Sequence, residues 1–314
     1  RYLSSAASDV YKRQVITVGN YDGIHKGHHD VLSYIVEEGK KRNIPSCLIT
    51  FDPNPFYVLS DKPDSINLQS LDEKLETLKE IGLDIVLIIP FDKEFSLMSA
   101  QIFADTVLKD LFNPTLISVG TNHYFGHKKE GNFEFLKAFC SDNNIELHTP
   151  VMREHMGSTI SSSLIRSLIL DGNSSKVYDY LGRFYGFNAT VVSGSNRGKT
   201  MNYPTANFIP TFENQLLPST GVYLTKVFLD GKWYFGMMNA GVRPTFNEKK
   251  FVMEVHILSD KFGNLYDKNF YIEFLDKIRD EKKFESKELL IKQIEKDKEV
   301  CIELIDTFKE KYEI

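Results

Sequence analysis

The sequence predicts an α/β domain with a doubly wound parallel sheet, followed by a small closed β-barrel that ends in a C-terminal helix. Strands alternate with helices in the first half of the chain, which is typical of parallel sheets. In the second half, short strands are separated by glycine, proline and polar turns, which favours a barrel. The 314 residues suffice for two ordinary domains. We place these domains at residues 15–181 and 182–314.

The alternating pattern of the first half can be followed element by element. Ser70 and Glu73 form a capping box that begins a helix, and Gly82 ends that helix. Ligands of doubly wound sheets bind at the carboxyl ends of the strands, so the loops there are the places to search for a site. The expected elements are strands at 15–18, 46–51, 84–90 and 115–119, and helices from 27, from 71 and over 96–112.

The second half begins after a polar linker at 171–175 and a short helix near 176–181. The tail from 286 has an apolar stripe at helical spacing, which we expect to pack on the barrel. Residues 1–14 show no sustained periodicity, and we expect them to be non-native or disordered. The expected barrel strands are 187–193, 222–229, 232–239, 252–258 and 270–275.

Composition narrows the class of protein. A hydrophobic content of 42% and a charged content of 26% are typical of a globular protein. The net charge of −5 argues against a general nucleic-acid binder. Cys47, Cys140 and Cys301 lie far apart, which favours reduced thiols and a cytoplasmic location. No apolar run is long enough for a membrane helix, and the oligomeric state is left open, a monomer included.

The loop at 19–28, GNYDGIHKGH, carries the first site. A strand, a glycine-bearing loop and a helix bind phosphate through free backbone N–H groups and the positive end of the helix. His25 and His28 are three residues apart, so both imidazoles can face one side of the helix start. The residues that we assign to phosphate here are Gly19, Asp22, Gly23 and Gly27.

This loop is not a Walker loop, because no G-x-x-x-x-G-K-[ST] is present. Histidine donors without a lysine clamp suit attack at an α-phosphate, where charge develops as pyrophosphate leaves. Residues 19–28 resemble the G-x-F-D-G-x-H-x-G-H signature of bifunctional riboflavin kinase/FAD synthetases, with Tyr21 in place of Phe. The resemblance implies a Rossmann-like nucleotidyltransferase domain that adenylylates FMN with ATP.

Further stretches of the first half resemble the same family. Residues 120–126 are similar to G-x-[DN]-F-x-F-G, which implies that Asn122 and Phe125 bind the flavin, although His123 replaces a Phe. In the T-F-x-P-H-P stretch, Asn54 replaces the histidine. Residues 160–166 resemble I-S-S-T-x-I-R, and a hydroxyl pair followed by an arginine can hold phosphate. The residues assigned to phosphate there are Ser162, Ser163 and Arg166.

The barrel carries the second set of motifs. Residues 197–207 resemble the riboflavin kinase pattern R-G-R-x-L-G-x-P-T-A-N. Oxygen ligands suit Mg²⁺, and Thr205 and Asn207 supply them. By resemblance, Glu254 is the base that takes the proton of the riboflavin 5′-hydroxyl, and Arg279, in an I-R-x-E-x-x-F stretch, lies near the flavin. The residues assigned to ATP here are Arg197, Gly198, Lys199 and Pro204.

Together these motifs predict a bifunctional enzyme that phosphorylates riboflavin to FMN with Mg·ATP and then converts FMN and ATP to FAD and pyrophosphate. One alternative is a riboflavin kinase whose N-terminal domain is degenerate, because Asn54, His123 and Ser163 all depart from the family pattern. A second is a flavin-sensing or RNA-binding regulator, which the acidic balance disfavours. An aminoacyl-tRNA synthetase would need a K-M-S-K-S loop, which the sequence lacks.

Overall fold

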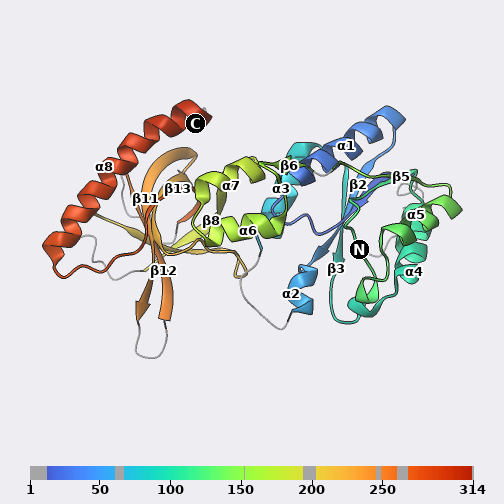
Figure 1. The fold of residues 1–314 in the computed structure, drawn as a ribbon, viewed down its shortest axis with the longest axis horizontal. Coiled ribbons are helices and arrows are strands. Elements are labelled where there is room, and N and C mark those ends of the chain that lie inside the picture. The colour runs from blue at the N-terminus through green and yellow to red at the C-terminus, as the bar shows by residue number, and fades with distance from the viewer. Residues whose placement is uncertain are drawn as a thin grey trace. The chain divides into compact units, whose positions relative to one another are not determined.

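The computed structural model describes residues 13–60, 67–151, 153–193, 203–244, 249–259 and 268–312. The chain forms two compact units that divide between Ser162 and Ser163, and each is described here by itself (Figure 1). Our boundary at residue 181 lies further along the chain than this division. Helices α6 and α7 accordingly pack as part of the second unit.

The first unit is built on a five-stranded parallel sheet with the order β3-β2-β1-β4-β5 (Figure 1). The order reverses between β1 and β4, which creates a topological switch point where such sheets bind ligands. This arrangement confirms the predicted doubly wound sheet and adds one strand, β5, to the four expected. The strands are β1 (Val15–Val18), β2 (Ser46–Asp52), β3 (Ile85–Pro90), β4 (Leu116–Ser118) and β5 (Glu146–His148).

Helices cover both faces of this sheet. Successive strand residues point to opposite faces, so Val15 packs against α1 and α3 while Ile16 packs against α4, η2 and α5. The single helix expected at 96–112 is divided, because a 3₁₀ turn ends at Leu97 and Ser99 then caps a new helix. The helices are α1 (Lys26–Arg42), α2 (Pro55–Leu59), α3 (Leu71–Ile81), η1 (Phe95–Leu97), α4 (Ala100–Phe103), η2 (Ala104–Phe112), η3 (His127–Lys129) and α5 (Phe133–Asp142), and a hairpin of β6 (Glu154–His155) and β7 (Ser158–Thr159) follows.

The described part of the chain begins at Arg13, and the expectation that residues 1–14 are non-native or disordered stays a prediction. Gln14 is fully buried, and its carbonyl accepts hydrogen bonds from the backbone N–H and the hydroxyl of Thr115. The backbone N–H of Arg13 donates to the carbonyls at the end of η2. Residues 1–12 lie outside the described part of the chain.

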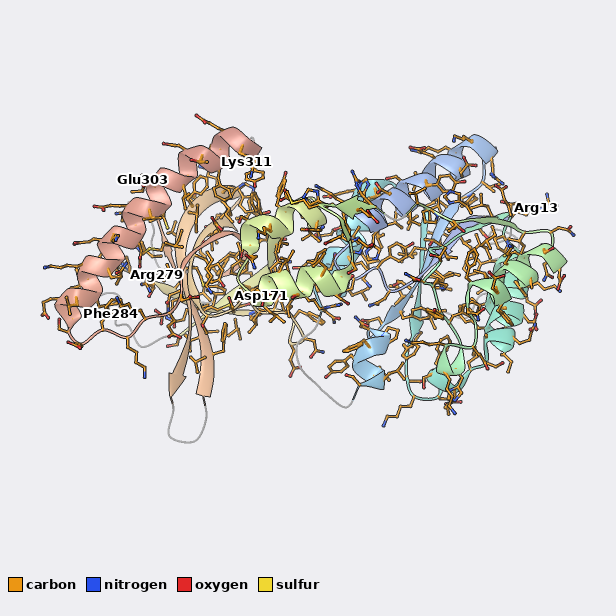
Figure 2. All side chains as sticks on the ribbon, in the orientation of Figure 1. Arg13, Asp171, Arg279, Phe284, Glu303 and Lys311 are labelled. Atoms are coloured by element: carbon orange, nitrogen blue, oxygen red, sulfur yellow. The ribbon has the colours of Figure 1, made fainter. Side chains whose placement is uncertain are left out.

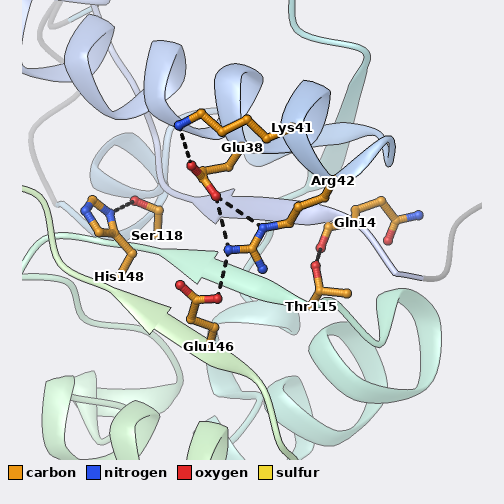
Figure 3. A network of polar contacts seen from close by, with 8 residues as sticks. All are labelled: Gln14, Glu38, Lys41, Arg42, Thr115, Ser118, Glu146 and His148. Atoms are coloured by element: carbon orange, nitrogen blue, oxygen red, sulfur yellow. Dashed lines mark hydrogen bonds and ion pairs between the residues drawn. The ribbon is translucent and has the colours of Figure 1, made fainter.

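Polar contacts fasten the edge strand β5 to α1 and β4 (Figure 3). Arg42, in the last turn of α1, donates to Glu38 one turn earlier and, at 2.8 Å, to Glu146 on β5. His148 lies 3.0 Å from the Ser118 hydroxyl through Nδ1, and its ring stacks on Tyr34 of α1. These contacts hold β4 and β5 together, and β4 ends at the switch point.

The second unit is a closed six-stranded barrel with the order β10-β11-β12-β9-β8-β13, which confirms the predicted barrel (Figure 1). Strand β9, which begins inside the P-T-A-N motif and extends beyond it, was not expected from the sequence. Its strands are β8 (Tyr185–Val192), β9 (Ala206–Pro210), β10 (Gly221–Leu229), β11 (Lys232–Pro244), β12 (Lys249–Ile257) and β13 (Asn269–Arg279), preceded by α6 (Ser162–Leu170) and α7 (Ser174–Leu181).

The long helix α8 (Lys287–Tyr312) packs on the outside of the barrel. Cys301 and Phe308 bury their side chains against Val222 and Leu224 of β10, as the apolar stripe predicted. Leu289, in the first turn of the helix, is exposed.

An ion pair adds a polar anchor at the other end of α8. Arg279, the last residue of β13, donates from Nε and Nη2 to the carboxylate of Asp297 at 2.7–2.9 Å. Asp297 is buried and also accepts from Gln293 one turn earlier. Figure 2 labels Arg279 and Phe284 beside α8, and the guanidinium lies 5.8 Å from the centre of the Phe284 ring.

The capping box of α3 gives the first prediction. The Ser70 hydroxyl accepts from the backbone N–H of Glu73, and the Glu73 carboxylate accepts from the backbone N–H of Ser70. We expect Ser70→Ala to lower the free energy of unfolding of the first unit by about 1 kcal/mol, because a helix-end donor loses its acceptor. Chemical denaturation followed by circular dichroism measures this change. Glu73→Gln is the control and should cost less, since an amide also completes a capping box; equal stability of Ser70→Ala and the unmodified protein would contradict the prediction.

Candidate active sites

The backbone of the loop between β1 and α1 adopts conformations that most residue types disfavour. Tyr21, Gly23 and Ile24 all have positive φ, at 50°, 81° and 34°. A Cβ on Gly23 would also lie 2.6 Å from Cδ1 of Leu68, so glycine is required there by both conformation and space. The Tyr21 phenol lies 2.6 Å from the Thr17 hydroxyl on β1, and burial raises its pKa. The loop therefore leaves the strand in one tightly specified path.

Hydrogen bonds from four separate segments hold this loop. The carbonyl of Asn20 accepts from Thr50 Oγ1 at 3.2 Å and from Lys74 Nζ at 3.0 Å. The buried Asp22 carboxylate accepts the backbone N–H of Leu68 with both oxygens, at 2.9 and 3.2 Å. Its backbone carbonyl accepts the hydroxyl of Ser162 at 2.9 Å. Asp22 thus shapes the loop through protein contacts.

The two histidines meet at the start of α1. His25 is the N-cap residue, and its Nδ1 accepts the backbone N–H of His28 at 3.2 Å. Neutral His25 therefore carries its proton on Nε2. The two rings stack with centroids 3.6 Å apart and an angle of 14° between their planes. Gly27 lies against this pair, since a Cβ there would be 3.4 Å from the His25 ring.

Electrostatics keep His28 neutral. Burial lowers the pKa of His28 well below its usual value, and the charges of His25 and Lys74 lower it further. Its Nδ1 is buried and has no hydrogen-bond partner among the described residues. Negative charge brought to the loop would offset the two positive neighbours and favour protonation of His28. The pair is thus suited to respond to a bound anion.

The other residues predicted for this site have different surroundings. Asn122 is exposed in the loop that follows β4, on the other side of the switch point from β1. Phe125 packs on the hydrophobic core beside Phe103 and Phe135. Ser163, exposed, and Arg166 lie on α6 in the second unit. Their assignments stay predictions, and the Ser162 hydroxyl would have to give up its bond to Asp22 to donate to a phosphate.

The barrel brings three of its predicted residues together on neighbouring strands. In the register of the sheet, Glu254 on β12 is paired with Asn207 on β9 and, on its other side, with Asn239 on β11. The Thr205 hydroxyl lies 3.5 Å from Oε2 of Glu254. Hydroxyl, amide and carboxylate oxygens therefore share one face of the barrel. Such a donor set fits a hard divalent cation that takes its remaining ligands from phosphates.

Contacts around this face fix its borders. His256 donates from Nδ1 to the carbonyl of Pro204 at 2.9 Å, and its ring meets Tyr203 edge to face. Glu281, in the loop after β13, lies over β11, since a Cβ on Gly241 would be 2.5 Å from Glu281 Oε1.

Four further barrel residues were assigned to the substrates, Arg279 to the flavin and residues 197–199 to ATP. Arg279 pairs with Asp297, so its predicted contact with the flavin remains a prediction. Arg197, Gly198 and Lys199 lie outside the described residues.

The sequence analysis missed two residues at these sites. Lys74 is 6% exposed and donates into the first loop, and Glu281 lies beside the face that holds Glu254. For Lys74 a signal was present, because position 74 falls on the apolar stripe that contains Leu71, Leu75 and Leu78. A lysine on such a stripe is unusual unless it has a polar partner inside. For Glu281 the signal was its place as the glutamate of the I-R-x-E-x-x-F stretch, from which we assigned Arg279 alone.

Taken together, a phosphate-type loop at the switch point of a parallel sheet and an oxygen-lined barrel face define a two-part transferase. Comparison with protein families agrees with this. A model of the FAD synthetase family matches residues 8–164, and a model of the riboflavin kinase family matches residues 181–305. The chain belongs to the bifunctional riboflavin kinase/FMN adenylyltransferase family, and the predicted pair of activities is confirmed at the level of these two domains.

Curated relatives with that name align along most of their length. The Escherichia coli K12 protein is 34% identical over 284 residues, which cover 90% of each chain. The Haemophilus influenzae protein is 32% identical and covers 94% of this chain and 95% of its own. The Buchnera aphidicola protein from Acyrthosiphon pisum is 31% identical, with 92% of each chain covered.

A solved structure from Streptococcus pneumoniae is also similar, with a TM-score of 0.84, 31% identity, and coverage of 92% of this chain and 94% of that one. Its title describes it as a macrolide-efflux protein. Within the described ranges of the present chain, no helix combines the length and apolar character needed to cross a membrane.

His123, which stands where the family usually has Phe, gives a pH-dependent prediction. Burial lowers its pKa to about 4, against 6.5 for an ordinary histidine. Between pH 6.5 and pH 4 the unfolded chain binds a proton at this histidine that the folded chain does not bind. The stability that is present above pH 6.5 is therefore lost as the pH falls toward 4. We expect His123→Phe to remove on the order of 2 kcal/mol of this loss at pH 4, as measured by denaturation at pH 7 and pH 4. Tyr124→Phe is the matched control; an unchanged pH dependence in His123→Phe would contradict the prediction.

Proposed function

We propose that the two activities are carried by the two separate groups of residues described above. In the barrel, the riboflavin 5′-hydroxyl oxygen attacks the γ-phosphorus of ATP, the bond from that phosphorus to the β-bridging oxygen breaks, and ADP leaves. The hydroxyl proton passes to the Glu254 carboxylate. The observation that carries this assignment is the placement of Glu254 between Asn207 and Asn239, 3.5 Å from the Thr205 hydroxyl.

The ion at this face is proposed to be Mg²⁺, with Thr205 and Asn207 as its protein ligands. Kinases and adenylyltransferases generally use ATP with a divalent metal, and neutral oxygen donors beside phosphates suit Mg²⁺. When bound, the ion would neutralise charge on the ATP phosphates. The residues of the chain orient the phosphates and the hydroxyl and accept the proton. Pro204 and the segment with Arg197, Gly198 and Lys199 are proposed to border the ATP phosphates.

In the first unit, an oxygen of the FMN phosphate attacks the α-phosphorus of ATP. The bond between the α-phosphorus and the oxygen that bridges it to the β-phosphorus breaks, so that pyrophosphate leaves. No proton needs to be removed from the nucleophile, because the phosphate is already ionised. His25 and His28 are proposed to donate hydrogen bonds to the phosphates on which charge develops. The loop at 19–28 supplies backbone N–H groups and the helix start. Asn122 and Phe125 are proposed to seat the flavin, and Ser162, Ser163 and Arg166 to hold phosphate oxygens.

Riboflavin, FMN and ATP are the substrates that this proposal assigns. A cytoplasmic location is proposed with it. The three cysteines are free and buried, and burial raises the pKa of each thiol, which suits a reducing compartment. No role for nucleic acid or membrane enters the proposal.

Separate replacement of His28 and Glu254 tests the two-site assignment. We expect His28→Ala to lower FAD formation from FMN and ATP by about a hundredfold or more, since a transition-state donor is lost, while FMN formation from riboflavin persists. Glu254→Ala should abolish FMN formation and leave FAD formation from added FMN. Chromatography of the flavins measures both reactions in one sample. Loss of both activities in either folded variant would contradict two separate sites. Absence of pyrophosphate from the unmodified protein supplied with FMN and ATP would favour the kinase-only alternative.

Thr205 tests the metal assignment. We expect Thr205→Val to raise the Mg²⁺ concentration needed for half-maximal FMN formation about tenfold, because the isosteric side chain lacks the ligating oxygen. Thr205→Ser keeps that oxygen and serves as the control. A titration of kinase rate against Mg²⁺ measures the shift. The same half-maximal concentration in Thr205→Val and Thr205→Ser would contradict the assignment.

A further inference from the structure

A buried lysine outside the family motifs contacts the phosphate loop. Lys74 belongs to α3, and its side chain is 6% exposed. It occupies the apolar stripe of the helix, near Leu71 and Leu78, where an ammonium group loses its hydration. Lysine is almost never buried to this degree without a partner, so the position calls for a physical reason.

The contact that Lys74 makes is directed at the loop itself. Its Nζ donates to the carbonyl of Asn20 at 3.0 Å, in the segment between β1 and α1. Thr50 Oγ1 donates to the same carbonyl at 3.2 Å, so this oxygen has both of its lone pairs engaged. Asn20 lies directly before the three positive-φ positions, and its carbonyl orientation sets the direction in which the loop continues.

The described residues balance the charge of Lys74 incompletely. An ammonium has three N–H donors, and Asn20 is the acceptor that the described residues provide for one of them. Among the described residues, no carboxylate oxygen lies within 4.0 Å of Nζ. Asp22 and Asp52 are close enough to raise the pKa of Lys74, but burial dominates and lowers it. The Asp22 carboxylate is engaged by the Leu68 N–H.

We propose that Lys74 is a positioning residue of the adenylyltransferase site, where its ammonium fixes the Asn20 carbonyl and places a positive charge behind the loop that receives the ATP phosphates. The inference rests on the proposed binding of ATP at residues 19–28. The loop has no Walker lysine, and Lys74 supplies the missing cation from a different helix. Its charge acts through the loop and through His28 and does not require contact with ATP.

His28 links this charge to the chemistry. The positive charge of Lys74 is one of the causes that lower the pKa of His28, together with burial and His25. Without bound phosphates, Lys74 therefore favours neutral His28. The negative charge of ATP would offset that of Lys74, so that substrate binding and the proton on His28 become coupled. The groups that face His28 in this balance are His25 on its own helix start, Lys74 on α3 and the phenol of Tyr21, whose ring lies 4.7 Å from that of His28 and whose raised pKa keeps it neutral.

Three variants separate the charge, the hydrogen bond and the fold. Lys74→Met has similar length but neither charge nor donors, Lys74→Arg keeps both, and Thr50→Val removes the other donor to Asn20 without altering charge. FAD formation from FMN and ATP is measured over a range of ATP concentrations and pH. The riboflavin kinase activity of the same samples reports on integrity of the chain, because it belongs to the other unit.

We expect Lys74→Met to raise KM for ATP in FAD formation at least about tenfold, which corresponds to about one charge-assisted contact, with kinase activity unchanged. The alkaline limb of its kcat/KM profile should move to higher pH, because the protonated imidazole is the donor to the phosphates and removal of the positive charge raises the pKa of His28. Lys74→Arg should restore most of the affinity and the original profile, and Thr50→Val should keep that profile.

The proposal is overturned if Lys74→Met stays within twofold of the unmodified protein in KM and shows the same pH profile. It is also overturned if Lys74→Arg is as impaired as Lys74→Met, since charge is then not the property that matters, or if both activities fall together. Should Lys74→Met fail to fold, Lys74→Gln, which keeps a donor and lacks the charge, replaces it under the same criteria. His28→Ala distinguishes failure of the proposed adenylyltransferase site from failure of the role of Lys74. If His28→Ala leaves FAD formation intact, the proposed site is wrong. If FAD formation is lost in His28→Ala and unchanged in Lys74→Met, only the role of Lys74 is refuted.

Discussion

The fixed path of the loop between β1 and α1 is the constraint on which the first active site depends. A single hydrogen bond contributes about 1 kcal/mol, and here several converge on two residues, Asn20 and Asp22. They come from β2, α3, the segment before α3 and the start of α6. Segments distant in sequence thereby hold a backbone with three strained or glycine-requiring positions among four residues, 21–24. His25 then caps α1 with its own side chain, which places its ring against His28 and aims both from a rigid helix end. Pre-organisation of this kind places donors before substrate arrives, so that little reorganisation is needed during the reaction.

In the barrel, the strand register fixes the positions of the side chains of the second site. A carboxylate on β12 lies between two amides on β9 and β11 because the antiparallel ladder leaves no freedom to slip without turning buried residues outward. Met253 and Val255, on either side of Glu254, are buried inside, which directs Glu254 to the opposite face. The loop after β13 is held by the pairing of Arg279 with Asp297 on α8, and Glu281 in that loop lies over Gly241. The helix therefore anchors a segment that borders the kinase face, in addition to covering apolar barrel residues.

Much of this architecture follows from local sequence signals, and the exceptions have physical causes. The capping box at Ser70 and Glu73 and the glycine stop at Gly82 define α3 because each satisfies helix-end groups locally. The division near Ser99 escaped prediction, since a serine cap within an apolar pattern leaves the helical period almost unchanged. Strand β9 was not expected, because its first residues belong to a stretch that we interpreted only as a ligand-binding motif. The histidine pair, Thr205 and Glu254 were singled out from motifs. The contacts of Lys74 and Arg279 depend on partners distant in sequence, which no local pattern specifies.

The central claim is that two separate sites use the two ends of ATP, one transferring the γ-phosphoryl group and the other the adenylyl group. The most direct test uses separate incubations of the unmodified protein with riboflavin and ATP, the ATP being labelled at either the γ- or the α-phosphorus. The FAD formed is then cleaved to FMN and AMP by a phosphodiesterase, and the label in each half is measured. The account predicts that label from the γ position appears in FMN and label from the α position in AMP. Label from the α position in the FMN half, or FAD without any label from the γ position, would contradict it.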